Sequence, residues 1–314
     1  MTGAEAFRLG GYVLQQLINT AGLAGLYALL AVAYALLHGV TNRIVLSFGD
    51  LAAFGAFAAC FLSLLLLFSG GGFGWGLALV LIGAAVFAGA ISSALQSQIY
   101  LPLGRAPGQA IMIASIGASI TFREIMRLKT GGREQWLPVL EAGPVIDRTL
   151  AGFSVRMTAI QGLSLLLAIV LIGALIAALR FSRAGRIWRA VSQDRRLCSL
   201  CGVNAGAVTV IAAGVAGVFS AAAGWLIAIG SGGFGFSMGL VFGLKALFAC
   251  LIGGFGAIGG AILGAIVLAS VETLWSAFFP IIYRDLVVFA LIAAVLIFRP
   301  EGILGVPARR DSER

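Results

Sequence analysis

Long apolar segments, separated by short polar ones, most constrain how this chain can fold. Several run for about 20 residues or more, the length at which an α-helix crosses the hydrocarbon core of a bilayer. Of the 314 residues, 61% are hydrophobic and only 11% are charged, whereas soluble domains carry about 25% charged residues. A β-barrel would instead show weak alternation in ten-residue segments. The sequence therefore predicts an all-α, polytopic bundle of membrane helices, with residues 1–314 as one transmembrane domain.

Nine segments are candidate membrane spans. The seventh is rich in glycine and contains Lys245, so a broken or re-entrant helix is an alternative to an ordinary span there. The nine segments cover residues 12–38, 44–68, 75–95, 111–128, 157–179, 207–229, 236–254, 258–279 and 285–298.

The loop at about 180–206, between the fifth and sixth candidate spans, contains six arginines and one aspartate. Basic residues near span ends favour the cytoplasmic side. Placing this loop inside puts twelve basic residues inside and seven outside, which predicts an outside N-terminus and a cytoplasmic tail at 299–314. The inside set is the loop's arginines with Arg43, Arg105, Arg299, Arg309, Arg310 and Arg314; the outside set is Arg8, Arg127, Lys129, Arg133, Arg148, Arg156 and Arg284.

Several function classes lack support in the sequence. The net charge of +9 comes from clusters at span ends, without the basic and aromatic interleaving of a nucleic-acid module, so we expect no nucleic-acid partner. No G-x-x-x-x-G-K-[ST] phosphate loop or metalloprotease histidine motif is present, and no G-x-S-x-G nucleophile elbow is expected at a strand-helix turn. We therefore predict no catalytic residues and no cofactor on this chain.

Ionisable residues inside spans are costly in lipid and are functional candidates by default. Asp50 follows Phe48 and Gly49 early in the second span, where it either caps a half-helix or lines a translocation path. Lys245 and Glu272 either form a buried pair that holds spans seven and eight together or support a path.

Two further charged pairs have simpler interpretations. Arg123 and Glu124 are expected near the outer interface, where long side chains reach water. Arg284 and Asp285 are expected to mark the start of the last span.

Small residues recur four apart in two late segments. Gly239 and Gly243 form one such motif, and Gly256, Gly260 and Gly264 form two more. Such spacing lets helix backbones approach closely. The expected role is packing within the chain, with a moving or dimer-forming seam as the alternative.

Cys198 and Cys201 have the spacing of half a zinc or redox motif. The chain has no second pair and only one histidine, His38, so we predict no metal site. Buried packing is the expected role of these cysteines. His38 ends the first span and is expected at the membrane interface.

Five stretches carry motifs that together identify a family. They are GLAGLYAL at 22–29, SIGASI at 115–120, RAGR at 183–186 followed by Asp194 and GVN at 202–204, Lys245 followed by IGGFG at 252–256 and by Glu272, and RPEGILG at 299–305. In this combination the chain resembles the LivH/LivM-type permeases of ABC importers for branched-chain and other hydrophobic amino acids. The resemblance runs from about residue 22 to 305.

The chain departs from the family pattern at three places. LivH-type proteins usually have Ile-Asn-Phe-Ala-His-Gly-Glu after the first span, whereas this chain has IVLSFGD at 44–50. Cys198 and Cys201 stand where small or aliphatic residues are common. Phe236 and Gly259 replace prolines. The first and third departures fall where a substrate path would pass, so they bear on the substrate more than on the family.

The resemblance implies a division of labour among subunits. This chain would form the translocation pathway with a second permease subunit, homologous or identical, in the inner membrane of a bacterium. Two ATPase subunits would bind ATP and magnesium, and a periplasmic binding protein would deliver the ligand. A short helix around 187–200, with Trp188 and Leu197 as apolar anchors, would insert into a groove of the ATPase. The predicted coupling residues are Arg186, Trp188, Asp194, Leu197 and Gly202, and the predicted pathway residues are Ser47, Phe48, Asp50, Ser115, Lys245 and Glu272.

Alternatives to this interpretation stay open. Small amides such as urea fit the same importer, and sugars or nucleosides are the substrates of related permeases. A different class is an ion-coupled secondary transporter, with Asp50 or Glu272 as the ion site. A third class is a membrane-embedded scaffold or enzyme.

Overall fold

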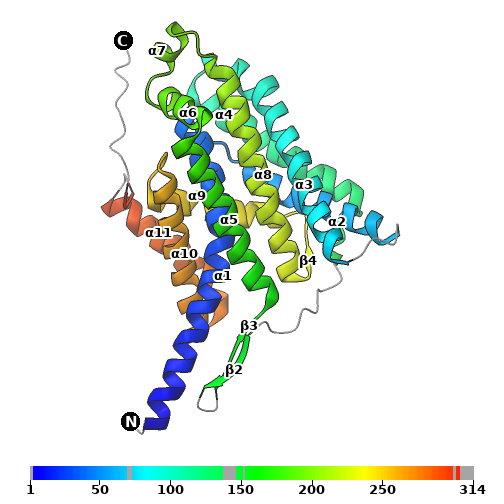
Figure 1. The fold of residues 1–314 in the computed structure, drawn as a ribbon, viewed down its shortest axis with the longest axis vertical. Coiled ribbons are helices and arrows are strands. Elements are labelled where there is room, and N and C mark those ends of the chain that lie inside the picture. The colour runs from blue at the N-terminus through cyan, green and yellow to red at the C-terminus, as the bar shows by residue number, and fades with distance from the viewer. Residues whose placement is uncertain (1–2, 69–72, 137–145, 151–152, 300–301, 305–314) are drawn as a thin grey trace.

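The computed structural model describes residues 3–68, 73–136, 146–150, 153–299 and 302–304, and this part of the chain is almost entirely helical (Figure 1). The outer half of the predicted tail, 305–314, lies outside the described residues, as do 300–301. The nine longest helices fall where the nine candidate spans were predicted. They are α1 (Gly3–Thr41), α2 (Phe48–Phe68), α3 (Phe73–Leu95), α4 (Gly108–Thr130), α5 (Ala159–Phe181), α8 (Ala205–Ser231), α9 (Met238–Gly253), α10 (Ile258–Phe278) and α11 (Arg284–Phe298).

The predicted number of nine spans is not confirmed. Within the described residues, six helical segments are long and apolar enough to cross a membrane, and they cover all or most of α1, α3, α5, α8, α10 and α11. α9 has 16 residues, which is about 24 Å at 1.5 Å per residue and shorter than a hydrocarbon core of about 30 Å. α2 has 21 residues with Asp50 in its first turn, and α4 carries charged residues in its second half.

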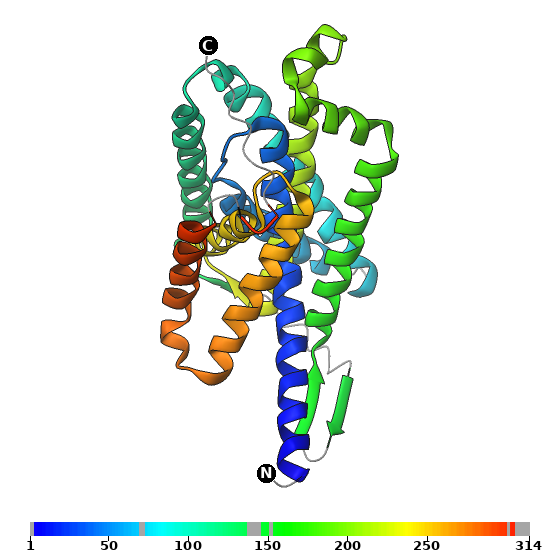
Figure 2. The same ribbon diagram turned by 90° about the vertical axis from the view of Figure 1, so that its left-hand side faces the viewer.

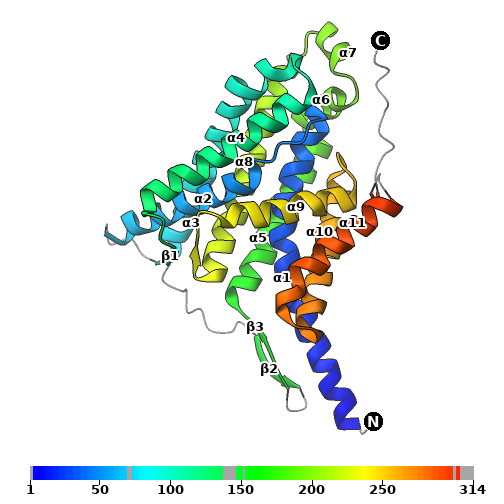
Figure 3. The same ribbon diagram turned by 180° about the vertical axis from the view of Figure 1, so that it is seen from behind.

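α1 and α8 form the centre of the bundle. Almost every residue of α1 from Tyr27 to Leu37 is buried, and α8 is buried over most of its length. Neither helix shows a one-sided apolar stripe in its sequence, as expected for helices surrounded by protein and lipid. α9 lies across the direction of α1 and α10 at mid-height of the bundle (Figure 3). The seventh segment is thus a short transverse helix, in line with the broken-helix alternative.

Glycines set the closest helix crossings, as the spacing motifs predicted. A methyl group at Gly49 of α2 would overlap the backbone of Gly239 and Gly243 in α9. Gly260 and Gly264 of α10 likewise lie against the backbone of α9. Gly256 differs because it lies in the α9–α10 turn with a φ of +86°, a conformation that favours glycine. Packing within the chain therefore accounts for the described motifs.

Two short two-stranded sheets were not predicted from the sequence. β2 (Ile146–Leu150) pairs antiparallel with β3 (Phe153–Met157), and β1 (Gln135–Trp136) pairs with β4 (Gly233–Phe234). The β2–β3 hairpin lies beside the first turns of α1, because both amide atoms of Gln15 bond to the backbone of Arg156. The fifth span begins at Ala159, after a capping box formed by Thr158 and Gln161.

The sequence predicted one short helix around 187–200, and the structure has two helices there. α6 (Arg183–Gln193) and α7 (Arg195–Leu200) meet at Asp194. They lie at one end of the molecule, and the first turns of α1 lie at the other (Figure 1). The connection between α3 and α4 contains a π-helical turn, η1 (Gln96–Tyr100), and a 3-10 turn, η2 (Pro102–Arg105). A third short turn, η3 (Ile281–Tyr283), precedes α11.

Candidate functional site

A cluster of charged side chains is buried where α9, α10 and α11 meet. The Lys245 ammonium in the middle of α9 lies 2.9 Å from a carboxylate oxygen of Glu272 in α10 and 2.8 Å from one of Asp285 in α11. Lys245 and Glu272 are 3% and 4% exposed. The predicted pairing of these two residues is therefore confirmed, and it joins three helices instead of two.

Two further groups complete this cluster. The Tyr27 hydroxyl of α1 donates a hydrogen bond of 2.6 Å to Glu272, and the Arg284 guanidinium lies 3.2 Å from the same carboxylate. Glu272 is thus held by a lysine, an arginine and a phenol. Sequence reasoning placed Arg284 and Asp285 at a span boundary and left out Tyr27. The opposite charges of the neighbouring Arg284 and Asp285 could have indicated an ion-pair cluster, whereas nothing in the sequence marks Tyr27 as a member of it.

A second ion pair joins α2 and α4. Asp50, in the first turn of α2 and 2% exposed, lies 3.3 Å from the Arg123 guanidinium of α4. The expectation that Arg123 extends to the outer interface is wrong, because the nearest compensation for its charge is the buried Asp50. Glu124 instead pairs with Arg127 on the exposed surface of α4. The structure therefore explains Asp50 as one half of an interhelical pair.

The predicted pathway residues Ser47, Phe48 and Ser115 are buried around the start of α2. The Ser115 hydroxyl of α4 accepts a hydrogen bond from the Leu46 amide at 3.0 Å, and Ser47 lies 3.2 Å from the Tyr100 hydroxyl. Phe48 packs edge-on against Tyr34 of α1. The structure thus brings Ser47, Phe48 and Ser115 together around the start of α2, whereas Lys245 and Glu272 belong to the other cluster.

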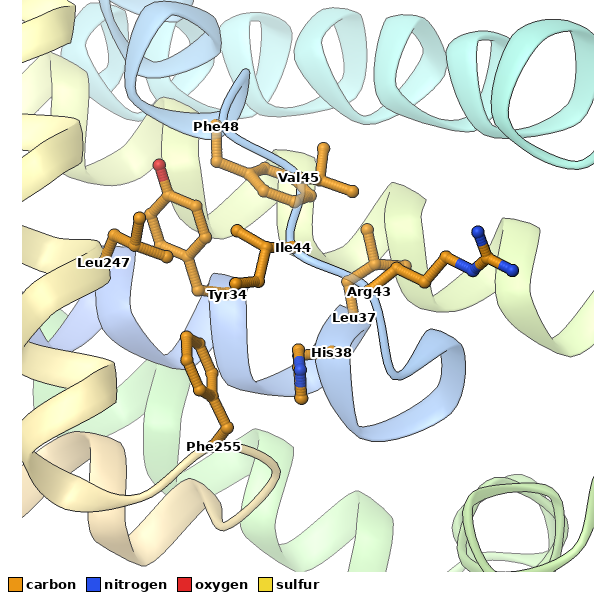
Figure 4. A pocket seen from close by; sticks show the side chains of 9 residues that line it. All are labelled: Tyr34, Leu37, His38, Arg43, Ile44, Val45, Phe48, Leu247 and Phe255. Atoms are coloured by element: carbon orange, nitrogen blue, oxygen red, sulfur yellow. The ribbon is translucent and has the colours of Figure 1, made fainter. Parts of the chain in front are cut away.

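A pocket lies beside this turn. Figure 4 shows His38 and Phe255 close together at one side of it, with Arg43 directed away. The two rings stack with centroids 4.4 Å apart, so the half-buried His38 packs against the α9–α10 turn. The lining is mostly apolar and consists of Tyr34, Leu37, His38, Arg43, Ile44, Val45, Phe48, Leu247 and Phe255.

α6 and α7 form a bracket at one end of the bundle, residues 183–200. Trp188 of α6 packs inward, so that a methyl group at Gly39 of α1 would lie 2.9 Å from the indole. Trp188 is therefore an internal anchor and not the exposed one predicted. The apolar side chains that α7 does expose are Leu197 at 60% and Leu200 at 84%.

Three other predicted positions lie in the bracket or directly after it. Asp194 ends α6 and caps α7, because its carboxylate accepts hydrogen bonds from the amides of Arg196 and Leu197 at 2.8 and 3.0 Å. Gly202, with a φ of +80°, ends α7 in a left-handed turn. Arg186 is exposed and bonds to the Phe181 carbonyl.

The cysteines at the end of the bracket only partly follow the prediction of buried packing. Cys198 packs partly against the core, whereas Cys201 is exposed. Among the described residues, no group of three or more histidine, cysteine or acidic side chains is placed to hold a metal ion.

Comparison with known families agrees with this architecture. Residues 16–296 match the family described as branched-chain amino acid transport system / permease component. The chain belongs to this family. No solved structure matches this member of the branched-chain permease family.

Curated relatives of this permease cover nearly the whole chain. It is 32% identical to the high-affinity branched-chain amino acid transport system permease protein LivH of Escherichia coli K12, over 94% of this chain and 96% of LivH. It is 28% identical to BraD of Pseudomonas aeruginosa, a permease protein of the same kind of system, over 94% of this chain and 97% of BraD. A more distant relative is the autoinducer 2 import permease LsrC of Escherichia coli, with 29% identity over 65% of this chain and 58% of LsrC.

Proposed function

We propose that this chain is the pathway-forming subunit of an ABC importer for branched-chain or other hydrophobic amino acids in a bacterial inner membrane. The single observation that carries the proposal is the bracket of α6 and α7, which exposes arginines and leucines while Trp188 fixes it to α1. The full-length similarity to LivH and BraD supports the substrate class.

The proposed assembly contains four further parts. A second permease subunit, homologous or identical, completes the pathway, and two ATPase subunits bind ATP and magnesium and contact the bracket. A periplasmic binding protein delivers the substrate at the opposite end, where the N-terminus lies outside. The bracket and the tail from Arg299 are cytoplasmic in this arrangement, as the basic residues favour.

The bracket can transmit motion because it is rigidly joined to the bundle. α6 follows α5 after a single residue, and Gly185 packs so tightly on Leu179 that a methyl group would overlap its carbonyl. The Trp188 indole bears on α1, the central helix. A displacement of the bracket by closing ATPase subunits is thus passed to α5 and α1 together, which suits rocking of helix groups during alternating access.

Reconstitution of the complete importer tests the proposal. The chain, its partner permease and the ATPase subunits are placed in liposomes with the binding protein, and uptake of radiolabelled leucine is measured. We expect uptake that requires ATP and the binding protein, with competition by isoleucine and valine and none by urea. Uptake by this chain alone, driven by a proton or sodium gradient, would instead establish the secondary transporter.

Two substitutions of Asp194 distinguish its role as the cap of α7 from the effect of its charge. We expect Asp194→Arg to lower ATP-driven uptake about tenfold or more while the complex remains in the membrane, because it removes the α7 cap and reverses a charge at the docking surface. Asp194→Asn is the matched control, since asparagine caps helices as well as aspartate does. Uptake and ATPase activity are measured on the same vesicles. Unchanged uptake in Asp194→Arg would contradict the assignment of the bracket to ATPase docking.

A further inference from the structure

Most of the charged side chains within the long helices lie on one side of the bundle. α4, α9 and α11 form this side: they lie together in front in Figure 3, and in Figure 2 α4 and α11 share one edge with α9 seen end-on between them. We call the exposed surface of these three helices the charged face. Its ionisable side chains include Arg123, Glu124, Arg127, Arg284 and Asp285, with exposed fractions of 26%, 49%, 52%, 36% and 50%, and the exposed Lys129.

Several of these groups lie at membrane depth. Arg123 is seven residues before the end of α4, which is about 10 Å along the helix. Asp285 contacts Lys245 in the middle of α9, and α9 crosses the bundle at mid-height (Figure 3). Lipid tails offer no hydrogen bonds or counter-charges to such groups, so exposure to lipid is costly there.

The other sides of the bundle contrast with the charged face. α3 contains no charged residue, and α5 contains none before Arg180 at its end. Both helices expose large aliphatic side chains, such as Ile82 at 59% and Ile169 at 61%. These surfaces suit contact with lipid, and α5 lies on the edge opposite α4 and α11 (Figure 2).

The charged face and the ion pairs beneath it carry both signs in nearly equal number. The cations are Arg123, Arg127, Lys129, Lys245 and Arg284, and the anions are Asp50, Glu124, Glu272 and Asp285. A balanced face of this kind can lie against a two-fold related copy of itself, because each cation can meet an anion of the other chain. A strongly acidic or basic soluble partner would match it less well.

We propose that the charged face of α4, α9 and α11 is the surface on which this chain meets a second permease chain of the same fold. The assignment rests on the proposed function, since it takes the chain to work as one of a pair. It places the Lys245 and Asp50 ion pairs at the subunit interface, where a second protein surface and water replace lipid around Arg123 and Asp285.

Spin labels in the assembled importer test this assignment. Ile120 of α4 is 56% exposed in this chain and lies one helical turn before Glu124. The variants Ile120→Cys, Ile82→Cys and Ile169→Cys are made after Cys198→Ser and Cys201→Ser, and each is labelled in membranes that contain all importer subunits. We expect the nitroxide at position 120 to collide with oxygen several-fold less often than those at 82 and 169, although the three sites are equally exposed in the single chain.

Cross-linking in the same membranes identifies the occupant. A short bifunctional thiol or photoactivated reagent attached at position 120 is expected to give an adduct with the mass of two permease chains. An adduct with an ATPase subunit or the binding protein would overturn the proposal, and so would oxygen access at position 120 equal to that at 82. ATP-driven uptake by these vesicles distinguishes failure of this assignment from failure of the proposed function. If uptake is retained while the label at position 120 is exposed to lipid, only the assignment of the charged face is rejected. If uptake by the unmodified importer does not depend on ATP, the proposed function is rejected.

Discussion

Lys245→Met is expected to lower the free energy of unfolding by about 3–5 kcal/mol, because it leaves the buried Glu272 carboxylate without its closest cation. Glu272 is 4% exposed and would keep only Arg284 and the Tyr27 hydroxyl. Methionine retains the length of the side chain, so the change is mainly electrostatic. The measurement is the thermal unfolding of the purified complex in detergent, followed by the loss of its native size-exclusion peak.

Lys129→Met provides the matched control, since it removes an exposed lysine near the end of α4 by the same substitution. Exposed charges contribute about 1 kcal/mol or less, so the control should unfold close to the parent. A double variant, Lys245→Met with Glu272→Gln, should lose much less than the sum of the two single variants, because Arg284 and Asp285 can still neutralise each other. Additive losses would show that Lys245 and Glu272 are not energetically coupled.

The helices were predictable because each is specified by its own residues. Apolar runs bounded by glycine, proline and basic clusters mark nine helices, and the same reasoning identified α9 as unusual through Lys245 and its glycines. The number of membrane crossings was less predictable, since it depends on the tilt of short helices such as α9. That tilt is set by packing against neighbouring helices and not by composition.

Of the charged contacts, one was predictable from the sequence and another was not. Lys245 and Glu272 could be matched because they are isolated opposite charges in consecutive spans. The pairing of Asp50 with Arg123 was missed, because a residue two turns from a helix end has two solutions: extension toward water or an ion pair inside the bundle. Only the tertiary arrangement, which brings α4 against the start of α2, decides between them.

In the bracket, the sequence indicated the helix ends but not the direction of the Trp188 side chain. A basic loop with Asp194 and Gly202 was visible in the sequence, and both residues do end or begin a helix there. The direction of Trp188 was not visible, because an indole in an amphipathic helix fits an internal groove as well as a partner's groove. Gly39, which makes room for it, is 149 residues earlier in the chain and carries no local mark.

Gly264→Ala is expected to disrupt the contact of α10 with α9 and to prevent accumulation of the folded subunit. The new methyl group would overlap the Ala249 carbonyl and lie 2.8 Å from the Gly253 amide nitrogen. Both are backbone atoms, so no side-chain rotation relieves the clash and the helices must separate. Overpacking costs about 1–3 kcal/mol and occasionally more, and separation of α9 from α10 also lengthens the Lys245–Glu272 contact. The amount of subunit recovered in detergent-solubilised membranes measures this effect.

Gly173→Ala is the matched control for Gly264→Ala, and it is expected to change the stability of the subunit in the opposite direction. Gly173 lies in the middle of α5 with no atom within 4 Å of the added methyl group, so alanine there should stabilise the helix by about 0.5–1 kcal/mol through its better helix propensity. The two variants make the same chemical change in the middle of a long helix, and they differ only in what the methyl group meets. If Gly264→Ala accumulates as well as Gly173→Ala and retains the parent's unfolding temperature, the close crossing of α9 and α10 does not exist in the membrane.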